Sequence, residues 1–479
     1  MKKGNNTKFD IVVIGSGPGG FTSANYFAKK GLSVCLLEMG DVPAINNFVG
    51  LKALENYYDN KGVIPILSQK IFGFAQGKVL GGGSVINGGL IWQLPRHTKK
   101  LWESQISKIE VEKIVKNYEE IKKDLDVKDS KELNPHDNLD SEKLYSGSEK
   151  LNWKCISVPR ALKKCEQNNN CGFGCPGLNK NSLDIVYKRS FIANGGDIKT
   201  KTKCIKLNHK INKIESITVD TVGLGKYDLY AKYYVLAAGA INSNLLLQNS
   251  KITNKSYIQF HLNFKITALY DDDLNADIGT MFTYQVQEFA DQGTLFMPTN
   301  FTKESLLSTI NSFSKEKKLE ILKNYSKAGL YVCQVQPTAV GRILNFFKFS
   351  VVTYFLTDRD KESIKESIIN LALLLFASGA KKLYLPTSEK NNVISSSDQV
   401  NTIVKGIKNW DFLSVHSMSA NRMGKDPNLS VTDIYGKVHS ISNLYIVDSS
   451  ALPSSVGESP QGVIMANSLR VSEHLFNKI

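Results

Sequence analysis

The N-terminal 38 residues constrain the fold of this chain more than any other segment. An apolar stretch over 9–14 leads into the turn GSGPGG, then into a helical pattern over 19–30 and a second apolar stretch over 32–37. A strand, a glycine turn, a helix and a second strand within about 30 residues predict a βαβ unit with parallel strands. The sequence therefore predicts an α/β chain built around a Rossmann-like domain.

The glycines of this turn have separate steric roles. Gly15 permits the tight turn, Gly17 lets the backbone approach a pyrophosphate, and Gly20 allows the helix to pack closely on the strand. The helix N-terminus adds free N–H groups and the positive end of its dipole. Glu38 ends the second strand, where a carboxylate accepts hydrogen bonds from a ribose diol and repels a 2′-phosphate. The unit therefore predicts a site for FAD or NAD, but not for NADP.

Two further segments place small residues next to apolar ones. GKVLGGGSVINGG (77–89) carries apolar residues between its glycines, which argues against a solvated linker. LAAGAINS (236–243) follows a buried-strand pattern and leads into a helical pattern. Small residues let a backbone lie directly against a ligand, so both segments are candidates for contact with a cofactor.

The C-terminal block is the last informative segment. A strand pattern over 444–447 ends in Asp448, and a helical pattern over 460–476 follows a Ser/Pro/Gly loop. Pro460 suits the first turn of that helix, where its missing N–H is not needed. The long segment before this block, 251–412, mixes strand-like and helical patterns and carries no recognisable motif.

The charge and the apolar stretches limit the partners that we expect. The chain has 479 residues, enough for two to four domains, and a net charge of +15, but only seven of its 60 basic residues are arginine. Arginine is the usual reader of phosphates and bases, so we expect no nucleic-acid partner.

The longest apolar stretch without charges, 367–380, is shorter than the roughly 20 residues of a membrane span. No signal peptide is readable at the N-terminus, and we expect a cytoplasmic protein without a membrane span.

The motifs, in this order and at these distances, resemble the glucose-methanol-choline (GMC) oxidoreductase family of FAD enzymes. GSGPGG with Glu38 is similar to that family's FAD fingerprint, and GKVLGGGSVINGG and LAAGAINS are similar to its two glycine-rich signatures. The final 65 residues resemble its C-terminal block. The resemblance covers both ends and the centre of the chain, whereas 256–410 carries almost none of it.

The resemblance implies a discontinuous fold. A Rossmann-like FAD-binding domain is interleaved with an α+β substrate domain that contains an antiparallel sheet. The expected boundaries are 1–95, 151–255 and 413–479 for the FAD domain, and 96–150 and 256–412 for the substrate domain and lid. The residues carried over to the cofactor are Gly15, Gly17, Gly20 and Glu38 for the ADP half, Gly82, Gly83, Ser84, Asn87 and Gly88 for the flavin, Ala238, Gly239 and Asp448 for the pyrophosphate and ribityl region, and Pro460 and Gln461 for the pyrimidine end.

The implied reaction is oxidation of an alcohol, which is a sugar, a polyol or another small molecule. A hydride moves to flavin N5 while a general base takes the hydroxyl proton. Histidine suits this role because its ordinary pKa is about 6.5, and His416, at the head of HSMSANRMG, matches the family's catalytic base. The second active-site residue, a His or Asn in relatives, is Ser459 here. A serine can still bond a substrate oxygen but is a poor base.

The other histidines are assigned weaker roles. His261 is expected to be a packing or hinge residue, with a catalytic role as the alternative, and His439 is expected to be structural. The remaining four lie in polar surroundings: His97, His136, His209 and His474.

The expected enzyme is a dehydrogenase rather than an oxidase, with an unidentified electron acceptor. The alternatives are a flavoprotein with altered or non-redox chemistry, an NAD-linked reductase, and a flavin-binding partner subunit.

Three of the seven cysteines are clustered in CEQNNNCGFGCP. Cys165, Cys171 and Cys175 resemble a segment that binds an iron–sulfur cluster in some sugar dehydrogenases of the family, and thiolates suit such a site. Their spacings of six and four residues match no standard CxxC pair, and Glu166 stands where those relatives have an adjacent cysteine. We therefore expect a metal-free structural loop, with a cluster as the alternative.

Overall fold

The N-terminal βαβ unit forms as the glycine pattern predicts. β1 (Lys8–Ile14) leads into α1 (Pro18–Lys29) and β2 (Val34–Leu37), and β1 pairs in parallel with β2. The four strand residues 11–14 are buried, as expected for a strand covered on both faces. The computed structural model describes residues 8–133, 138–299, 301–346 and 349–479.

The first sheet joins three separated segments of the chain. β11 (Gly225–Leu236) pairs in parallel with β1 and with the C-terminal strand β21 (Leu444–Ile446). Central and C-terminal segments therefore share a sheet with the N-terminus, which confirms the discontinuous Rossmann-like fold. The strand order is β8-β2-β1-β11-β10-β9, with β8 (Asp197–Lys199), β9 (Thr202–Lys210) and β10 (Lys213–Thr221).

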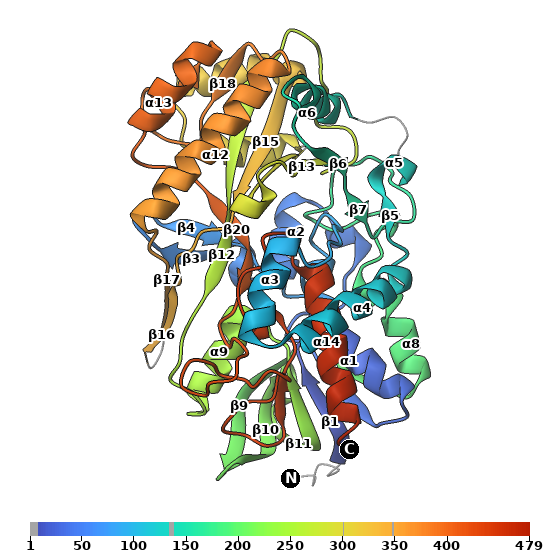
Figure 1. Cartoon of the computed structure of the whole chain (residues 1–479). Helices are drawn as coiled ribbons and strands as arrows, with labels where there is room; N and C mark the ends of the chain where they lie inside the picture. The colour runs from blue at the N-terminus through green and yellow to red at the C-terminus, as the bar shows by residue number, and fades with distance from the viewer. Residues whose placement is uncertain (1–7, 134–137, 300, 347–348) are drawn as a thin grey trace.

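Helices α1, α4 and α14 pack together beside this sheet (Figure 1). α14 (Gln461–Phe476) contacts both α1 and α4 (Lys108–Asp124). Buried Glu110 of α4 accepts a hydrogen bond from Arg470 of α14 at 2.6 Å. Residues 108–124, which the boundaries assigned to the substrate domain, therefore pack on the C-terminal helix. Sequence periodicity shows which face of a helix is apolar, but not which core that face joins.

The second sheet is larger and forms the upper part of the molecule in Figure 1. Its central strands are antiparallel, as expected for the substrate domain. Four strands, β3, β4, β6 and β20, come from segments that the boundaries assigned to the FAD domain. The order is β16 (Arg342–Phe346), β17 (Phe349–Thr353), β3 (Ile64–Leu67), β4 (Phe72–Phe74), β20 (Leu413–Met418), β12 (Gln259–Leu269), β15 (Ala328–Val335), β14 (Thr294–Pro298), β13 (Tyr284–Val286) and β6 (Cys155–Ser157), with β18 (Lys382–Tyr384) beside β12 and β19 (Val393–Ile394) beside β18.

Helix α12 (Asp358–Ala377) covers one face of this sheet (Figure 1). A capping box between Thr357 and Asp360 starts the helix, and Gly379, with φ +99°, follows its end. The side chains at positions 364, 368, 371 and 375 are buried in the core of the second sheet. The opposite face of the sheet is therefore left for the cavity described below. In the part of the chain that the structure describes, no helix combines the length and apolar character needed to cross a bilayer.

The remaining elements connect these layers. They are α2 (Gly50–Tyr57), α3 (Arg96–Gln105), β5 (Lys128–Asp129), α5 (Ser130–Leu133), α6 (Leu139–Lys150), β7 (Pro159–Arg160), α7 (Leu183–Val186), α8 (Lys188–Ala193), α9 (Ala240–Asn249), α10 (Lys303–Thr309), α11 (Lys315–Lys323) and α13 (Val400–Gly406).

Candidate active site

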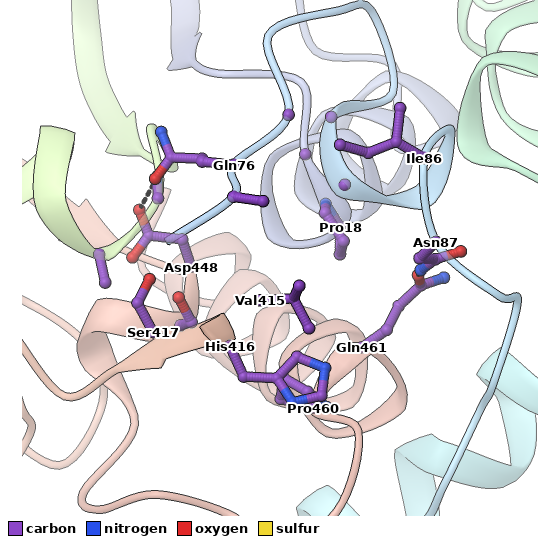
Figure 2. Close-up of a pocket in the computed structure, with 18 of the residues that line it drawn as sticks. Pro18, Gln76, Ile86, Asn87, Val415, His416, Ser417, Asp448, Pro460 and Gln461 are labelled. Atoms are coloured by element: carbon purple, nitrogen blue, oxygen red, sulfur yellow. Dashed lines mark hydrogen bonds between the residues drawn. The ribbon is translucent and has the colours of Figure 1, made fainter. Parts of the chain in front are cut away.

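One cavity of about 700 Å³ joins the two sheets. Figure 2 shows Pro18, Asn87, His416 and Asp448, from four separate segments, arranged around the same space. We call the part lined by residues 15–19, 82–88 and 237–240 the glycine half, and the part lined by β12, β13, β14 and β15 the sheet half. A cavity of this size is within the range of ligand sites.

The glycines of the first turn divide into packing and cavity-lining residues. A Cβ on Gly15, which has φ +103°, would lie 2.4 Å from the carbonyl oxygen of Ala237, and one on Gly20 would lie 1.8 Å from that of Gly15. Gly17 lines the cavity, and a Cβ there would meet no atom within 4 Å. Gly20 therefore packs the helix on the strand, whereas Gly17 leaves room for a ligand at the N-terminus of α1.

Glu38 lies at the cavity edge with its carboxylate held by the first turn. Its Oε2 accepts hydrogen bonds from the N–H and the hydroxyl of Ser16, at 3.2 and 2.5 Å, and its Oε1 accepts one from the N–H of Gly40 at 2.7 Å. Burial raises the pKa of this carboxyl, although the hydrogen bonds oppose the shift. The orientation of Glu38 is thus fixed before a ribose arrives.

The second glycine segment lies against the start of α1. Gly82 has φ +56°, and a Cβ on it would lie 2.6 Å from the Cα of Gly17. Buried Lys180 holds the end of the segment by donating hydrogen bonds to the carbonyls of Val85, Asn87 and Cys171, at 2.6, 2.7 and 3.1 Å. The expected residues Gly82, Gly83, Asn87 and Gly88 line the cavity.

Ser84 is the exception in this segment. It is 1% exposed and does not line the cavity. Its hydroxyl donates to the carbonyl of Gly81 at 2.7 Å and accepts from the N–H of Leu183 at 3.1 Å. The sequence placed this residue on the flavin, but in the structure its side chain is used to hold the short helical turn of the segment.

Asp448 joins the third and fourth segments. Its Oδ2 accepts hydrogen bonds from the N–H of Gly239 at 2.8 Å and from the hydroxyl of Ser243 at 2.5 Å. Its Oδ1 accepts from the N–H of Ser450 at 2.9 Å. Ala238, Gly239 and Asp448 all line the cavity, so the structure brings together the residues expected near the pyrophosphate and ribityl chain.

The N-terminus of α14 forms another wall. Pro460 and Gln461 line the cavity, and Asn87 donates a hydrogen bond to Oε1 of Gln461 at 2.5 Å (Figure 2). The positive end of this helix dipole favours negative charge in the cavity.

His416 forms a pair with His261. The two residues face each other across β20 and β12, and their Nδ1 atoms are 3.2 Å apart with the rings nearly perpendicular, at 88°. His416 lines the cavity, whereas His261 is completely buried behind it. Burial lowers the pKa of His416 to about 4 and that of His261 well below its ordinary value. Both rings are therefore neutral at pH 7.

The backbone fixes where the protons of this pair lie. The N–H of Gly457 donates to Nε2 of His261 at 3.0 Å, so that nitrogen carries no proton. Neutral His261 then holds its proton on Nδ1 and donates it to Nδ1 of His416. His416 consequently carries its own proton on Nε2, which has no protein partner within the described residues.

His261 was expected to pack or to act as a hinge, and the structure instead gives it a direct contact with His416. The strand-like alternation of 258–269 is visible in the sequence, but it does not reveal which residue of β20 stands opposite position 261. Ser459 lines the cavity as expected. His439 contacts Ser430 at 2.9 Å, away from the cavity, and His136 lies outside the described residues.

Glu458 is a second residue that the sequence motifs did not indicate. It lines the cavity, and its Oε1 accepts hydrogen bonds from the side chains of Gln285 and Gln287, at 2.9 and 3.0 Å. Its buried Oε2 has no partner in the described part of the chain. Burial raises its pKa to about 8. The cavity wall therefore holds a carboxyl group that is mostly protonated at pH 7.

The cysteine segment packs around the second glycine segment. Cys165, Cys171 and Cys175 are free thiols. No group of three or more His, Cys, Asp or Glu side chains is arranged to hold a metal ion within the described ranges. The carbonyl of Cys171 accepts a hydrogen bond from Lys180, the same lysine that holds Val85 and Asn87. This segment thus helps to position the cavity wall.

The fold and the cavity define a class of protein. Glycine turns at the ends of parallel strands, facing a cavity closed by a second sheet, are the architecture of a dinucleotide-binding oxidoreductase. Profiles of the N- and C-terminal parts of GMC oxidoreductases match residues 52–283 and 349–468. The chain therefore belongs to the GMC oxidoreductase family, a group of FAD-dependent oxidoreductases, which confirms the resemblance and the expected cofactor.

Similar proteins span nearly the whole chain. A GMC-type oxidoreductase of Sinorhizobium fredii is 23% identical over 97% of this chain and 94% of its own length. A long-chain-alcohol oxidase of Arabidopsis thaliana is 23% identical over 98% of this chain and 68% of its own length. The crystal structure of pyridoxine 4-oxidase from Mesorbium loti superposes with a TM-score of 0.76 at 15% identity, covering 98% of this chain and 99% of that one. The last two are named as oxidases, so the expectation of a dehydrogenase rather than an oxidase gains no support.

The residues of the glycine half fit FAD. Gly17 leaves open space at a helix N-terminus, and Glu38 stands at the edge where a ribose would lie. Gly82 and Gly239 have positive φ values and bring backbone to the cavity without side chains. These features suit a long, phosphate-containing cofactor.

Proposed function

We propose that this protein oxidises the hydroxyl group of a small-molecule alcohol with FAD as the hydride acceptor. The observation that carries the proposal is the position of His416, at the boundary of the glycine half and the sheet half, with His261 behind it. The names of the similar alcohol oxidases support this reaction class. Bound FAD would supply flavin N5 as the acceptor of the hydride from the carbinol carbon.

The chain's own residues hold the cofactor and orient the alcohol. The α1 N-terminus and Gly17 would face the pyrophosphate, Glu38 would bond the adenine-side ribose, and the α14 N-terminus would stabilise negative charge at the pyrimidine end. Ser459 and His416 would both bond the substrate oxygen. His416 and Glu458 both line this part of the cavity.

His416 is the residue that would take the hydroxyl proton as general base. This role requires that Nε2 of His416 be free of a proton, whereas the hydrogen bond from Gly457 to His261 favours a proton there. The base form therefore needs His261 to exchange its contact with the Gly457 N–H for a contact with an acceptor. In the tautomer of the structure, Nε2–H would instead donate to the substrate oxygen and stabilise its developing negative charge.

The test is anaerobic reduction of the purified yellow holoenzyme by a panel of sugars, polyols and aliphatic alcohols. We expect at least one class to bleach the flavin absorbance. A protein that lacks flavin, or whose flavin no alcohol bleaches, would instead match the non-redox or partner-subunit alternatives and overturn the proposal. Reoxidation by oxygen and by an artificial carrier, measured separately, would assign the enzyme to the oxidases or to the dehydrogenases.

Two substitutions of His416 separate its roles. His416→Ala should retain flavin and slow bleaching by about 100-fold or more, as expected for loss of acid–base catalysis. His416→Gln keeps an N–H donor but cannot take a proton. The base role predicts that Gln is as slow as Ala, whereas the donor role predicts that Gln is clearly faster. His209→Ala, on β9 outside the cavity, is the control and should bleach at the wild-type rate.

A further inference from the structure

Strand β12 presents two different faces. Phe260, Leu262 and Phe264 are buried in the core of the second sheet beneath α12. The residues between them alternate to the opposite face, and Asn263 and Lys265 there line the cavity. An amphipathic strand of this kind normally turns its polar face to water, whereas here that face forms the floor of the sheet half.

Lys265 is an unpaired cation on this floor. Among the described residues, its ammonium group has no hydrogen-bond or ion-pair partner. Burial alone lowers its pKa to about 8, and no neighbouring carboxylate opposes the shift. The group is still mostly protonated at pH 7. A charge that is partly removed from water and has no partner is costly, so a partner from outside the chain would stabilise it.

Lys180 shows what a structural buried lysine looks like in this protein. Its pKa is also lowered to about 8 by burial, but its ammonium group donates to three backbone carbonyls. All three of its N–H donors are thereby satisfied. Lys265 is only partly buried, because its side chain faces the cavity, and it lacks such acceptors. This distinguishes a ligand-facing lysine from one that holds the chain together.

The strand register places Lys265 at one end of a row across the sheet half. Lys265 pairs with Val332, Val332 pairs with Met297, and Gln285 lies opposite Met297 on the next strand. At about 4.8 Å per strand, the row is roughly 14 Å long. Its middle is apolar, one end carries the cation, and the other end meets Glu458 through Gln285.

We propose that Lys265 binds a carboxylate of the substrate, so that the alcohol oxidised by this enzyme is a hydroxy acid. This inference rests on the proposed function and names its substrate class. Lys265 follows His261, the partner of His416, by four residues. The two residues are therefore about 13 Å apart along the strand. The hydroxyl and the carboxylate therefore bind at separate places, with the cavity-facing Asn263 between them on β12. Val332 and Met297, which continue the row across the sheet from Lys265, offer an apolar surface to the carbons near the carboxylate.

Binding without turnover tests the inference independently of the reaction. Oxidised holoenzyme is titrated by calorimetry with unbranched alkanoates from butanoate to decanoate, which have no hydroxyl group to oxidise. We expect at least one to bind, and Lys265→Met to weaken its binding at least tenfold while Lys265→Arg retains most of it. Lys203→Met removes a positive charge from the far end of the same cavity, beside Thr202, and is the matched control.

Turnover measurements then test whether the carboxylate and the hydroxyl that is oxidised belong to the same substrate. ω-Hydroxyalkanoates are compared with the diols of equal length, and we expect the wild type to prefer the acids in kcat/KM by tenfold or more. Lys265→Met should reduce that ratio to near one.

The failures can be told apart. The inference is overturned if no alkanoate binds the wild type, or if Lys265→Met binds it as tightly. It is also overturned if the substitution changes flavin affinity or the flavin spectrum but leaves alkanoate binding intact, because Lys265 would then serve the cofactor. Failure of every alcohol to bleach the flavin, with alkanoate binding lost in Lys265→Met, would reject only the proposed reaction.

Discussion

The two halves of the cavity are built by opposite means. The glycine half is made largely of backbone, because many of its residues are glycines and Ser84 turns its side chain into the protein. The sheet half is made of side chains, such as Lys265 and Gln285, that project from neighbouring strands. A backbone site tolerates little change in shape where an added Cβ would meet a carbonyl or a Cα, as at Gly15, Gly20 and Gly82. A side-chain site can change its chemistry one residue at a time without disturbing the strands.

The largest expected effect tests the rigidity of the glycine half. Gly20→Ala should destabilise the protein by about 3 kcal/mol or more, because its Cβ would overlap the carbonyl oxygen of Gly15 at 1.8 Å and neither backbone segment can move aside. Gly17→Ala should leave the free energy of unfolding nearly unchanged, because its Cβ enters open space. The second variant should instead weaken FAD binding at least tenfold. Chemical denaturation of the flavin-free protein and titration with FAD measure the two effects, and equal destabilisation by both would contradict this division.

The next effect concerns a titratable side chain of the sheet half. Glu458 has a pKa of about 8 in the folded protein, far above the ordinary 4.5. The folded state therefore keeps a proton that the unfolded state releases. Protonated Glu458 thus contributes to the free energy of unfolding below pH 4.5, and this contribution is lost as the pH rises to 8. Glu458→Gln preserves the contacts with Gln285 and Gln287 without this titration. Between pH 5 and 8, the free energy of unfolding of the wild type should fall relative to the variant by roughly 3 kcal/mol.

Denaturation of the two proteins at pH 5 and pH 8 measures this difference. Glu288→Gln, at a mostly exposed carboxylate near the same strands, is the control and should show no such trend. Parallel curves for wild type and Glu458→Gln would mean that Glu458 is ionised in the folded protein, and the sheet half would then carry a negative charge opposite Lys265.

The third effect tests whether the histidine pair acts as a unit. His261→Ala should retain FAD and lower the rate of substrate-driven bleaching by roughly 30-fold, because His416 loses the partner that orients its ring. In a protein that already carries His416→Ala, the same change should have little further effect on rate. Additive losses in this double-mutant cycle would show that His261 contributes packing alone.

These residues also show which features of the structure could be predicted from the sequence. The glycine half could be predicted because its residues lie in short consecutive motifs, in which the glycines have steric reasons, as Gly15 and Gly20 illustrate. The strand-like pattern over 258–269 and the helical pattern over about 361–377 could be predicted from their periodicity, and the structure forms β12 and α12 there. The pairing of His261 with His416 and the row from Lys265 to Gln285 could not, because both depend on the register of strands that are far apart in the chain. The domain boundaries differ from the sheets for the same reason.

The smallest effect concerns Ser459, for which the family resemblance implies a position next to the substrate oxygen. With His261 already bonded to His416, a second partner at position 459 is not needed to orient the ring. Ser459→Ala should therefore cost about 1 kcal/mol of transition-state stabilisation, the contribution of one neutral hydrogen bond to the substrate oxygen. Steady-state kinetics should show a fall in kcat/KM of less than about tenfold. A loss of kcat/KM as large as that of His416→Ala would indicate that the main catalytic role belongs to Ser459 in the C-terminal loop and not to the pair of His416 and His261.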